Sequence, residues 1–395
     1  MTRLVITTNL RQAPFQNASG WIYIVDIESG KILQRTSGME PPYRKTDHNP
    51  RGGMRGMRGI SFYNGELATA DYSSVFLFDK RWNLMRVFTH PSVSAIHEIL
   101  YVKEGVWVTS TANDMLARFD KAGTLAEFHD LRAQKSIMRQ LGGPMAQTLR
   151  PEDIVDGRID FRNRSYVKSD KYDRLHLNSL VIAPDGRFYL SLGLIVGDSF
   201  VKLMNTKTLL LRLKLWDTVI SINRIIRRAF KLEKKILSEL VIQPRQGQSA
   251  ILTTNLHDDW QVYSQFPVSH NPSHSIRILD DGTCVYLNSS SGSILHFGMD
   301  GEILSNKKLS DKFLRGLLVL PNDQLAVGAG NTLMIYDLKT RSIIHQIDLS
   351  DEPQNSVFDI KELPPEFDLP PDSLQEKVGK VIGFDGQAII MEKNE

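Results

Sequence analysis

Residues 315–337, RGLLVLPNDQLAVGAGNTLMIYD, contain the pattern from which the architecture can be inferred. An apolar run is followed by a tight turn at Pro321-Asn322-Asp323, a second apolar run, and a third run that ends at Asp337. Short runs rich in Val, Ile, Leu and aromatic residues between turn signals are typical of strands. This stretch therefore predicts three consecutive strands joined by tight turns.

The same unit recurs along the chain. Hairpin-type Asn-Gly or Asp-Gly turns occur at Asn64-Gly65, Asp185-Gly186 and Asp281-Gly282, because Asn or Asp followed by Gly tolerates positive φ. A polar residue precedes the first strand of each unit at separations of 39, 81, 96, 41 and 40 residues: Arg58, His97, Asn178, His274, Arg315 and Asn355. A period near 40 with four short strands per unit is the mark of a β-propeller blade. We predict an all-β chain whose residues 1–395 form one β-propeller domain of six blades, with five or seven blades as alternatives.

The sixth blade is expected to be shared between the two ends of the chain. Residues 355–360 read as an inner strand with little blade-like sequence after it, whereas residues 4–7, 21–25 and 31–33 read as strands without an inner one. Pairing the two sets closes the ring and removes two open sheet edges.

Two long intervals between repeats carry insertions. Residues 131–173 are polar and predict a long loop, and residues 205–245 predict a basic amphipathic helical insertion. Residues 201–244 hold ten Lys or Arg against three Asp or Glu. We favour a helix packed across the propeller rim with a solvated basic face. Docking to a protein or peptide partner is the next alternative, followed by contact with an anionic membrane surface.

Composition excludes several classes of protein. The 395 residues are 41% hydrophobic and 24% charged, which is an ordinary globular balance. The net charge of +3 is too small to indicate nucleic-acid binding. Cys284 is the single cysteine, so neither an internal disulfide nor a cysteine-based metal site is possible, and we expect it to be a small core residue. The absence of a signal-like N-terminus or a long apolar run predicts a soluble, cytoplasmic protein.

The first strand of each propeller blade lines the central channel, so the six repeated polar residues are expected to form a ring near one mouth, flanked by Glu98, His176 and His270. In this ring, Arg58 and Arg315 could hold a carboxylate, sulfate or phosphate, because guanidinium groups bind such anions bidentately. We predict Arg58, Asn178, Arg315, Asn355 and His270 as substrate-binding residues. We predict His97, His176, His274 and Glu98 as catalytic acid/base groups. The competing interpretation is that polar side chains in a wet channel simply hydrogen-bond water.

The cofactor requirement is left open. His97, His176 and His274 could together bind one divalent metal ion, although no short-range ligand motif supports this. Adjacent side chains on a strand point to opposite faces, so His97 and Glu98 are not expected to share one ion. His176 and Asn178 can share a face.

Four motifs carry a resemblance to a known group of sequences: His97-Glu98, residues 173–179 (DRLHLNS), residues 272–275 (PSHS) and residues 314–317 (LRGL). They resemble the inner-strand motifs of an uncharacterised bacterial family of hypothetical propeller proteins, over roughly residues 55–130, 173–195 and 265–360. Ser179 stands where that family more usually has Gly. The resemblance implies the propeller fold and a special status for these positions, but no reaction.

Two functions are carried forward. The first is a small-molecule enzyme, a hydrolase or lyase, that acts on a small anionic substrate at the channel mouth, because neither class needs a large bound cofactor. The second is a non-catalytic propeller that binds a protein or peptide partner, with the basic helix as the docking element.

Overall fold

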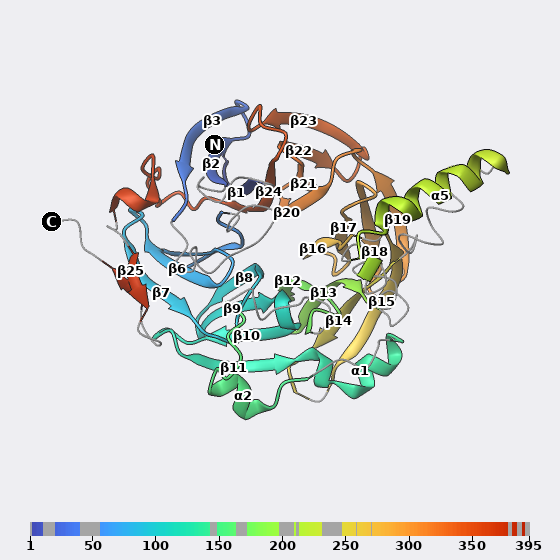
Figure 1. Cartoon of the computed structure of the whole chain (residues 1–395). Coiled ribbons are helices and arrows are strands. Elements are labelled where there is room, and N and C mark those ends of the chain that lie inside the picture. The colour runs from blue at the N-terminus through green and yellow to red at the C-terminus, as the bar shows by residue number, and fades with distance from the viewer. Residues whose placement is uncertain are drawn as a thin grey trace.

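The computed structural model describes residues 2–10, 20–39, 56–142, 148–162, 172–196, 209–210, 213–230, 247–257, 259–269, 271–377, 381–384 and 389–391. These residues form six four-stranded antiparallel sheets arranged in a ring around one axis (Figure 1). The predicted six-bladed β-propeller is therefore confirmed.

The strands of each blade follow one another from the axis outwards. Blade 1 consists of β24 (Asn355–Glu362), β1 (Arg3–Leu10), β2 (Trp21–Asp26) and β3 (Lys31–Ser37). Blade 2 consists of β4 (Ile60–Tyr63), β5 (Glu66–Ala70), β6 (Ser74–Asp79) and β7 (Leu84–Thr89). Blade 3 consists of β8 (Ile96–Val102), β9 (Gly105–Ser110), β10 (Met115–Phe119) and β11 (Leu125–Asp130).

The second half of the ring repeats the pattern. Blade 4 consists of β12 (Leu177–Ile182), β13 (Phe188–Ile195), β14 (Gly247–Thr254) and β15 (Gln261–Val268). Blade 5 consists of β16 (His274–Ile278), β17 (Cys284–Asn288), β18 (Ser293–Phe297) and β19 (Ile303–Lys308). Blade 6 consists of β20 (Leu314–Leu320), β21 (Gln324–Ala329), β22 (Thr332–Asp337) and β23 (Ser342–Asp348).

The ring closes by pairing the two ends of the chain, as the sequence predicts. Strand β24 lies antiparallel to β1, with Leu4 opposite Glu362 and Leu10 opposite Asn355. Blade 1 therefore takes its inner strand from the C-terminal part of the chain and its other three strands from the N-terminal part, which ties blade 6 to blade 2 without an open edge.

The tight turns form where the sequence places them. The turn between β4 and β5 consists of Asn64 and Gly65, with φ values of 51° and 74°. Two consecutive positive φ values define the type I′ hairpin turn, whose twist matches that of the flanking strands. The turn residues therefore fix the register of the hairpin that follows.

Among the described residues, one apolar cluster lies between each pair of neighbouring blades, and a smaller cluster contains Ala112, Phe161 and Tyr172. Between blades 4 and 5, for example, Phe266 packs edge-on against Tyr286, with ring centroids 5.2 Å apart. Cys284 belongs to this cluster and is 1% exposed, as expected for a core residue. The second strand of a blade is covered on both faces and is almost fully buried, as in β9, β17 and β21, whereas the outermost strands β3, β19 and β23 are largely exposed.

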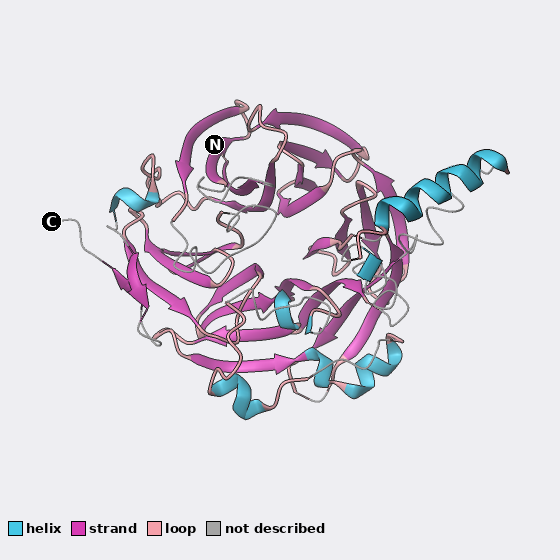
Figure 2. Cartoon of the chain, viewed as in Figure 1, coloured by secondary structure: helices cyan, strands magenta, loops and turns pink. Residues whose placement is uncertain are grey.

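Most of the helices lie at the periphery of the ring, whereas one short helix lies inside it, beside the inner strands (Figure 2). The predicted long loop 131–173 contains the 3₁₀ helix η3 (Leu131–Ala133) and the helices α1 (Lys135–Gln140) and α2 (Pro151–Val155). Other short elements are the 3₁₀ helices η2 (Thr111–Asn113) and η4 (Leu374–Lys377), and a terminal hairpin of β25 (Val381–Phe384) and β26 (Ile389–Met391). The sequence misses α1 and α2 because each is at most six residues long.

The predicted helix of the 205–245 insertion is α5 (Trp216–Ala229). It extends away from the ring (Figure 1), and Ile222, Ile225 and Phe230 are 51%, 66% and 72% exposed. The expected packing across the rim is therefore wrong, since much of the apolar stripe faces outwards. No helix among the described residues is both long and apolar enough to span a bilayer.

Candidate functional site

A β-bulge near the start of each inner strand shapes the site. The pairing register shifts between Ile96 and Ile99 in β8, and equivalent shifts occur in β12, β16, β20 and β24. In blade 2, Ala70 bonds to both residues of the pair Arg58-Gly59, accepting from Arg58 N and donating to Gly59 O. A bulge sets two residues of one strand against one residue of its partner and re-aims their side chains.

The bulges align one ring position in all six blades. In each inner strand this position lies in the bulge or directly before it, and two positions before an Ile or Leu. The residues are Arg58, His97, Asn178, His274, Arg315 and Phe358. Five of the six residues predicted from the repeat therefore occupy equivalent places. The sixth place belongs to Phe358, which contacts the ring of His97 at a centroid distance of 5.7 Å.

The prediction of Asn355 as a ring residue is corrected by the structure. Asn355 is the first residue of β24, three positions before the ring position, and it is completely buried. Its side-chain amide donates to the Tyr23 hydroxyl of β2 at 3.0 Å. The repeat spacing of 40 residues led to Asn355 because the lengths of the loops before the inner strands differ.

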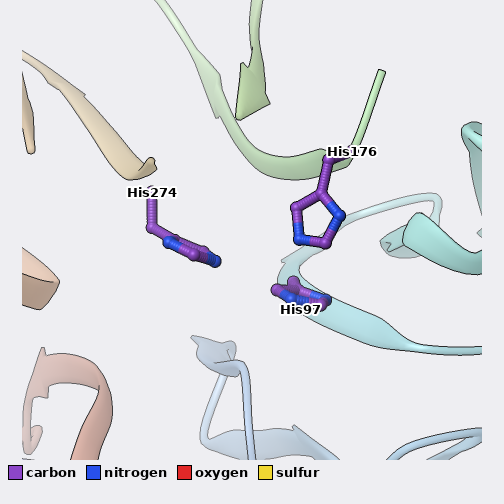
Figure 3. Close-up of side chains that lie close together, drawn as sticks. All are labelled: His97, His176 and His274. Carbon is purple, nitrogen blue, oxygen red and sulfur yellow. The ribbon is translucent and has the colours of Figure 1, made fainter. Parts of the chain in front are cut away.

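Three histidines from three successive blades converge at the axis (Figure 3). His97 belongs to β8, His176 directly precedes β12, and His274 begins β16. Their ring centroids are 5.2, 5.6 and 6.0 Å apart. One potential ligand atom from each histidine lies within 4.8 Å of the other two. The structure thus brings together the three histidines that the sequence selected.

Each of these imidazoles is anchored through Nδ1. His97 Nδ1 lies 2.7 Å from the carbonyl of Ala95, which can only accept, so this nitrogen carries the proton. His176 Nδ1 lies 3.0 Å from the carboxylate of Asp173, and His274 Nδ1 lies 3.2 Å from the Ser289 hydroxyl. The same nitrogen, Nδ1, is therefore the anchored one in all three rings.

Left-handed backbone conformations are concentrated beside the cluster. Ala95, His176 and Ser275 have φ values of 52°, 53° and 64°. Such conformations disfavour residues other than Gly and persist only where the surroundings impose them. In this site they turn the Ala95 carbonyl towards His97 and set the chain path that carries His176 and His274.

Asp114 holds the loop that carries Asp173 and His176. Its carboxylate accepts hydrogen bonds from the backbone N–H groups of Arg174 at 2.5 Å and Leu175 at 2.9 Å. Burial, and next the charge of Asp173, raise the pKa of Asp114 to about 7. Asp114 is therefore a positioning residue for the anchored histidine.

Two arginines flank the cluster around Phe358. The guanidinium carbon of Arg315 lies 3.4 Å from the centre of the Phe358 ring, and that of Arg58 lies 5.5 Å from it. Arg58 also donates to the carbonyl of Ile96 at 2.7 Å. Burial, followed by the charge of Arg315, holds the pKa of His97 well below its usual value, so this imidazole is neutral at pH 7.

Glu98, predicted as a catalytic group, is not brought to the histidines. Its carboxylate lies on the other side of the bulge, 2.5 Å from Nη2 of Arg277. Arg277 also reaches Asp359 at 3.4 Å, and Lys361 lies 3.0 Å from Asp359. These four residues form what we call the ionic layer, which links inner strands of blades 1, 3 and 5. Because side chains alternate along β8, His97 points to the histidine cluster and its neighbour Glu98 points to the ionic layer.

Ser179 has a role that glycine could not supply. Its hydroxyl donates to the Glu98 carboxylate and accepts from the backbone N–H of Ile276 at 3.1 Å. Ser179 thereby joins the inner strands of blades 3, 4 and 5. The Ser179 hydroxyl therefore supports the ionic layer.

The remaining predicted ligand residues are placed as follows. Asn178 is 3% exposed, and its side-chain amide donates to the carbonyl of Ser273 at 2.6 Å, which links blade 4 to the loop before blade 5. His270 lies outside the described residues. Asp173, Phe358 and Arg277 are the contributors to this region that sequence reasoning missed. The Asp173…His176 spacing was a usable signal, since a residue three positions away can orient an imidazole.

Comparison with known proteins supports the propeller fold and does not indicate a function. No protein-family model and no curated protein sequence matches the chain. The chain is similar in structure to a protein in a nidogen/laminin complex (TM-score 0.51, 9% identity, covering 91% of this chain and 97% of that chain). It is also similar to a protein of unknown function from Bacteroides caccae (0.49, 8%, 92% and 99%) and to virginiamycin B lyase from Staphylococcus aureus (0.40, 10%, 75% and 71%). At these identities the similarity concerns the chain path and not the chemistry.

Proposed function

We propose that the protein is a small-molecule enzyme, a hydrolase or lyase, whose anionic substrate binds at the end of the propeller axis marked by the histidine cluster. The observation that carries the proposal is the convergence of His97, His176 and His274 beside two arginines. His274 is buried and the other two are partly buried, and clustered imidazoles held by defined partners are typical of catalytic or ligand-binding sites.

Arg58 and Arg315 supply the anion preference. Each guanidinium lies near the same Phe358 ring. A guanidinium binds the two oxygens of a carboxylate or phosphate through parallel N–H groups, and it also stacks on aromatic faces. The carboxylates of this region have other partners, because Glu98 and Asp359 belong to the ionic layer and Asp173 contacts Nδ1 of His176.

The neutral state of His97 is suited to chemistry at pH 7. A neutral imidazole offers a lone pair on Nε2, which can accept a proton from a substrate or bind a metal ion. An anion bound by the arginines would place its reactive carbon or phosphorus near this lone pair. Proton abstraction leads to a lyase, and activation of water leads to a hydrolase.

Anion binding is the first test. Isothermal titration with inorganic phosphate and small dicarboxylates should detect binding that weakens at least about tenfold in Arg315→Gln, the loss expected for a charge-assisted bidentate contact. Arg35→Gln is the matched control, because Arg35 also stacks on an aromatic ring, with its guanidinium carbon 3.7 Å from the centre of Trp21, but far from the axis. Equal binding by both variants would refute the assignment.

Turnover is the second test. Small phosphate esters, sulfate esters and carboxylate-bearing esters would be screened for product with the wild type and with His274→Ala. We expect turnover to be lost in the variant while its unfolding midpoint stays close to that of the wild type. Turnover that is unchanged in His274→Ala, or no turnover of any anionic substrate, contradicts the enzymatic proposal.

A second candidate function, docking through α5, rests on the exposed apolar stripe of that helix. Ile222, Ile226 and Phe230 recur at helical spacing and are exposed, and the sequence of the helix also contains Arg224, Arg227 and Arg228. An apolar stripe flanked by arginines is suited to an anionic lipid surface better than to a neutral one.

Vesicle sedimentation tests the docking function. Vesicles with anionic headgroups should retain the protein, those with only zwitterionic headgroups should not, and Ile222→Ser/Ile225→Ser should abolish retention. Ile32→Ser on β3 is the control, since Ile32 is also exposed, at 40%. Retention by both vesicle types, or by the double variant, rules out this second function in favour of a protein partner or none.

A further inference from the structure

We propose that the Nε2 atoms of His97, His176 and His274 bind one divalent transition-metal ion, and that the anionic substrate completes its coordination. The inference rests on the proposed function for the anion only; the metal site stands on the geometry of the three imidazoles.

The donors are set up in the manner of metal ligands. A ligating histidine usually donates its other ring N–H to a carboxylate, a carbonyl or another oxygen, which fixes the tautomer and the ring orientation. His176 has the carboxylate of Asp173 in this role, His97 has the Ala95 carbonyl, and His274 faces the Ser289 hydroxyl. The outer partner contacts Nδ1 in all three rings, so Nε2 is the nitrogen that we assign to the metal ion.

The spacing is close to that of a ligand set. Imidazole nitrogens lie about 2.0–2.1 Å from zinc, which puts two tetrahedral ligands about 3.4 Å apart. The ligand atoms of the cluster lie within 4.8 Å of one another, so side-chain rotations that move each by less than about 1 Å would close the set. The ring centroids form a nearly equilateral triangle, with sides of 5.2 to 6.0 Å, as a shared central ion requires.

The type of donor atom limits which metal ions the site would bind. Three neutral nitrogen donors suit zinc, iron, cobalt or nickel, whereas magnesium and calcium prefer oxygen. Three protein ligands also leave at least one coordination position for water or substrate, as in catalytic sites rather than structural ones. The described residues place no carboxylate among the ligand atoms of this cluster.

The positive charge of the two arginines beside the cluster favours an anion as the next ligand of the metal ion. Arg58 and Arg315 lie beside the cluster: their guanidinium carbons are 5.5 and 3.4 Å from the centre of the Phe358 ring, which in turn contacts His97. A dication added there is repelled unless a negative ligand enters with it. One oxygen of a phosphate or carboxylate on the metal and others on the arginines would satisfy both demands, so metal and anion should bind cooperatively.

Metal binding is measured on the whole chain, freed of metal with a chelator and dialysed. Titration with Zn²⁺ or Co²⁺ should give one ion per chain, and Co²⁺ should show the visible absorption bands of nitrogen ligation. His176→Ala and His274→Ala should each weaken binding at least about 100-fold, as expected when one of three ligands is lost. His345→Ala is the control, because His345 is exposed on the outer strand β23.

Asp173→Asn keeps the metal ligands and tests their orientation. The loss of a carboxylate behind a metal-bound imidazole typically costs 10- to 100-fold in affinity. We expect that loss with little change in the unfolding midpoint. Zn²⁺ affinity that is unchanged in both His176→Ala and His274→Ala, or the absence of Zn²⁺ binding by the wild type, overturns the metal site.

Titration of Zn²⁺ with and without inorganic phosphate separates the two proposals. We expect phosphate to tighten Zn²⁺ binding and Zn²⁺ to tighten phosphate binding by the same factor, because coupling between two ligands is reciprocal. Phosphate that binds through Arg315 while Zn²⁺ does not bind refutes the metal site and leaves the proposed function standing. Zn²⁺ that binds without any effect of phosphate or dicarboxylates supports the metal site and contradicts the anionic substrate.

Discussion

Replacing Glu98 with Gln tests whether this residue stabilises the fold rather than acting on a substrate. The Glu98 side chain is 8% exposed, and its carboxylate lies 2.5 Å from Nη2 of Arg277. The ionic layer contains two carboxylates and two cations, so the substitution leaves it with one uncompensated positive charge. Removing one partner of a buried ion pair typically costs about 3–5 kcal/mol of unfolding free energy.

The expected loss is large enough to measure. With about 2.1 cal/mol/K of unfolding entropy per residue and 395 residues, a loss of about 4 kcal/mol lowers the melting temperature by about 5 °C. Urea unfolding should show a lower midpoint at an unchanged slope. Glu127→Gln is the matched control: Glu127 pairs with Arg118 at 3.1 Å but is 35% exposed, and such pairs are worth about 0.2–1 kcal/mol. A loss in Glu98→Gln no greater than in this control would refute the argument.

The pH dependence gives an independent check on the same variant. Burial acts to raise the pKa of Glu98, but Arg277 and Lys361 outweigh it, so its folded-state pKa lies below the ordinary value. A lowered carboxyl pKa contributes stability that is present above the unfolded pKa, near 4.3, and is lost as the pH falls through the folded value. The stability difference between wild type and Glu98→Gln should therefore shrink below about pH 4.3. A difference that stays constant from pH 7 to pH 3 contradicts this account.

Three further predictions concern single groups. Burial, and next the charge of Arg162, lower the pKa of His90 to about 4, and its Nδ1 accepts from the backbone N–H of Ser92 at 3.1 Å. Protonation of His90 therefore destabilises the fold as the pH falls from 6.5 to 4, and in His90→Asn the urea midpoint should depend less on pH over that range. An equal pH dependence of the urea midpoint in both proteins would refute this. Burial raises the pKa of the Cys284 thiol to about 12, so iodoacetamide at pH 8 should label it only after unfolding; rapid labelling of the folded protein would contradict its burial. Phe358→Leu removes the ring beneath Arg315 and should weaken phosphate binding by about 2- to 30-fold, as for a cation–π contact of about 0.5–2 kcal/mol. Unchanged phosphate titration curves would show that the stacking does not position the guanidinium.

Blade number and ring closure could be predicted because their signals are local. A blade is a run of short strands between turns, and turns such as Asn64-Gly65 dictate both the reversal and the register. The repeat length then sets the architecture. Closure followed from counting strands, since an inner strand at residues 355–360 without partners and N-terminal strands without an inner strand complete one another.

The site was only partly predictable because its groups meet across blades. The repeat position identified His97 and His274, but it gave Asn355 in place of Phe358, since spacing alone cannot locate a bulge. Glu98 lies next to His97 in sequence and in another layer of the structure. The orientation of α5 was missed for a related reason: an amphipathic pattern shows that a helix has an apolar face and not what covers it.

The ionic layer and the histidine cluster are built on the same strands, and this has a consequence for metal binding. His97 and Glu98 are adjacent in β8, Arg277 follows His274 in β16, and Phe358 precedes Asp359 in β24. The contacts of Arg277 with Glu98 and Asp359 therefore hold in place the three strands that carry two proposed ligands and the aromatic ring between the arginines. A ligand set is tight only when its supports are rigid. If the metal site exists, Glu98→Gln should weaken Zn²⁺ binding although Glu98 is not a ligand, whereas Glu127→Gln should leave it unchanged. Equal Zn²⁺ affinity in the two variants, with stability lost only in Glu98→Gln, would show that the ionic layer supports the fold without positioning the site.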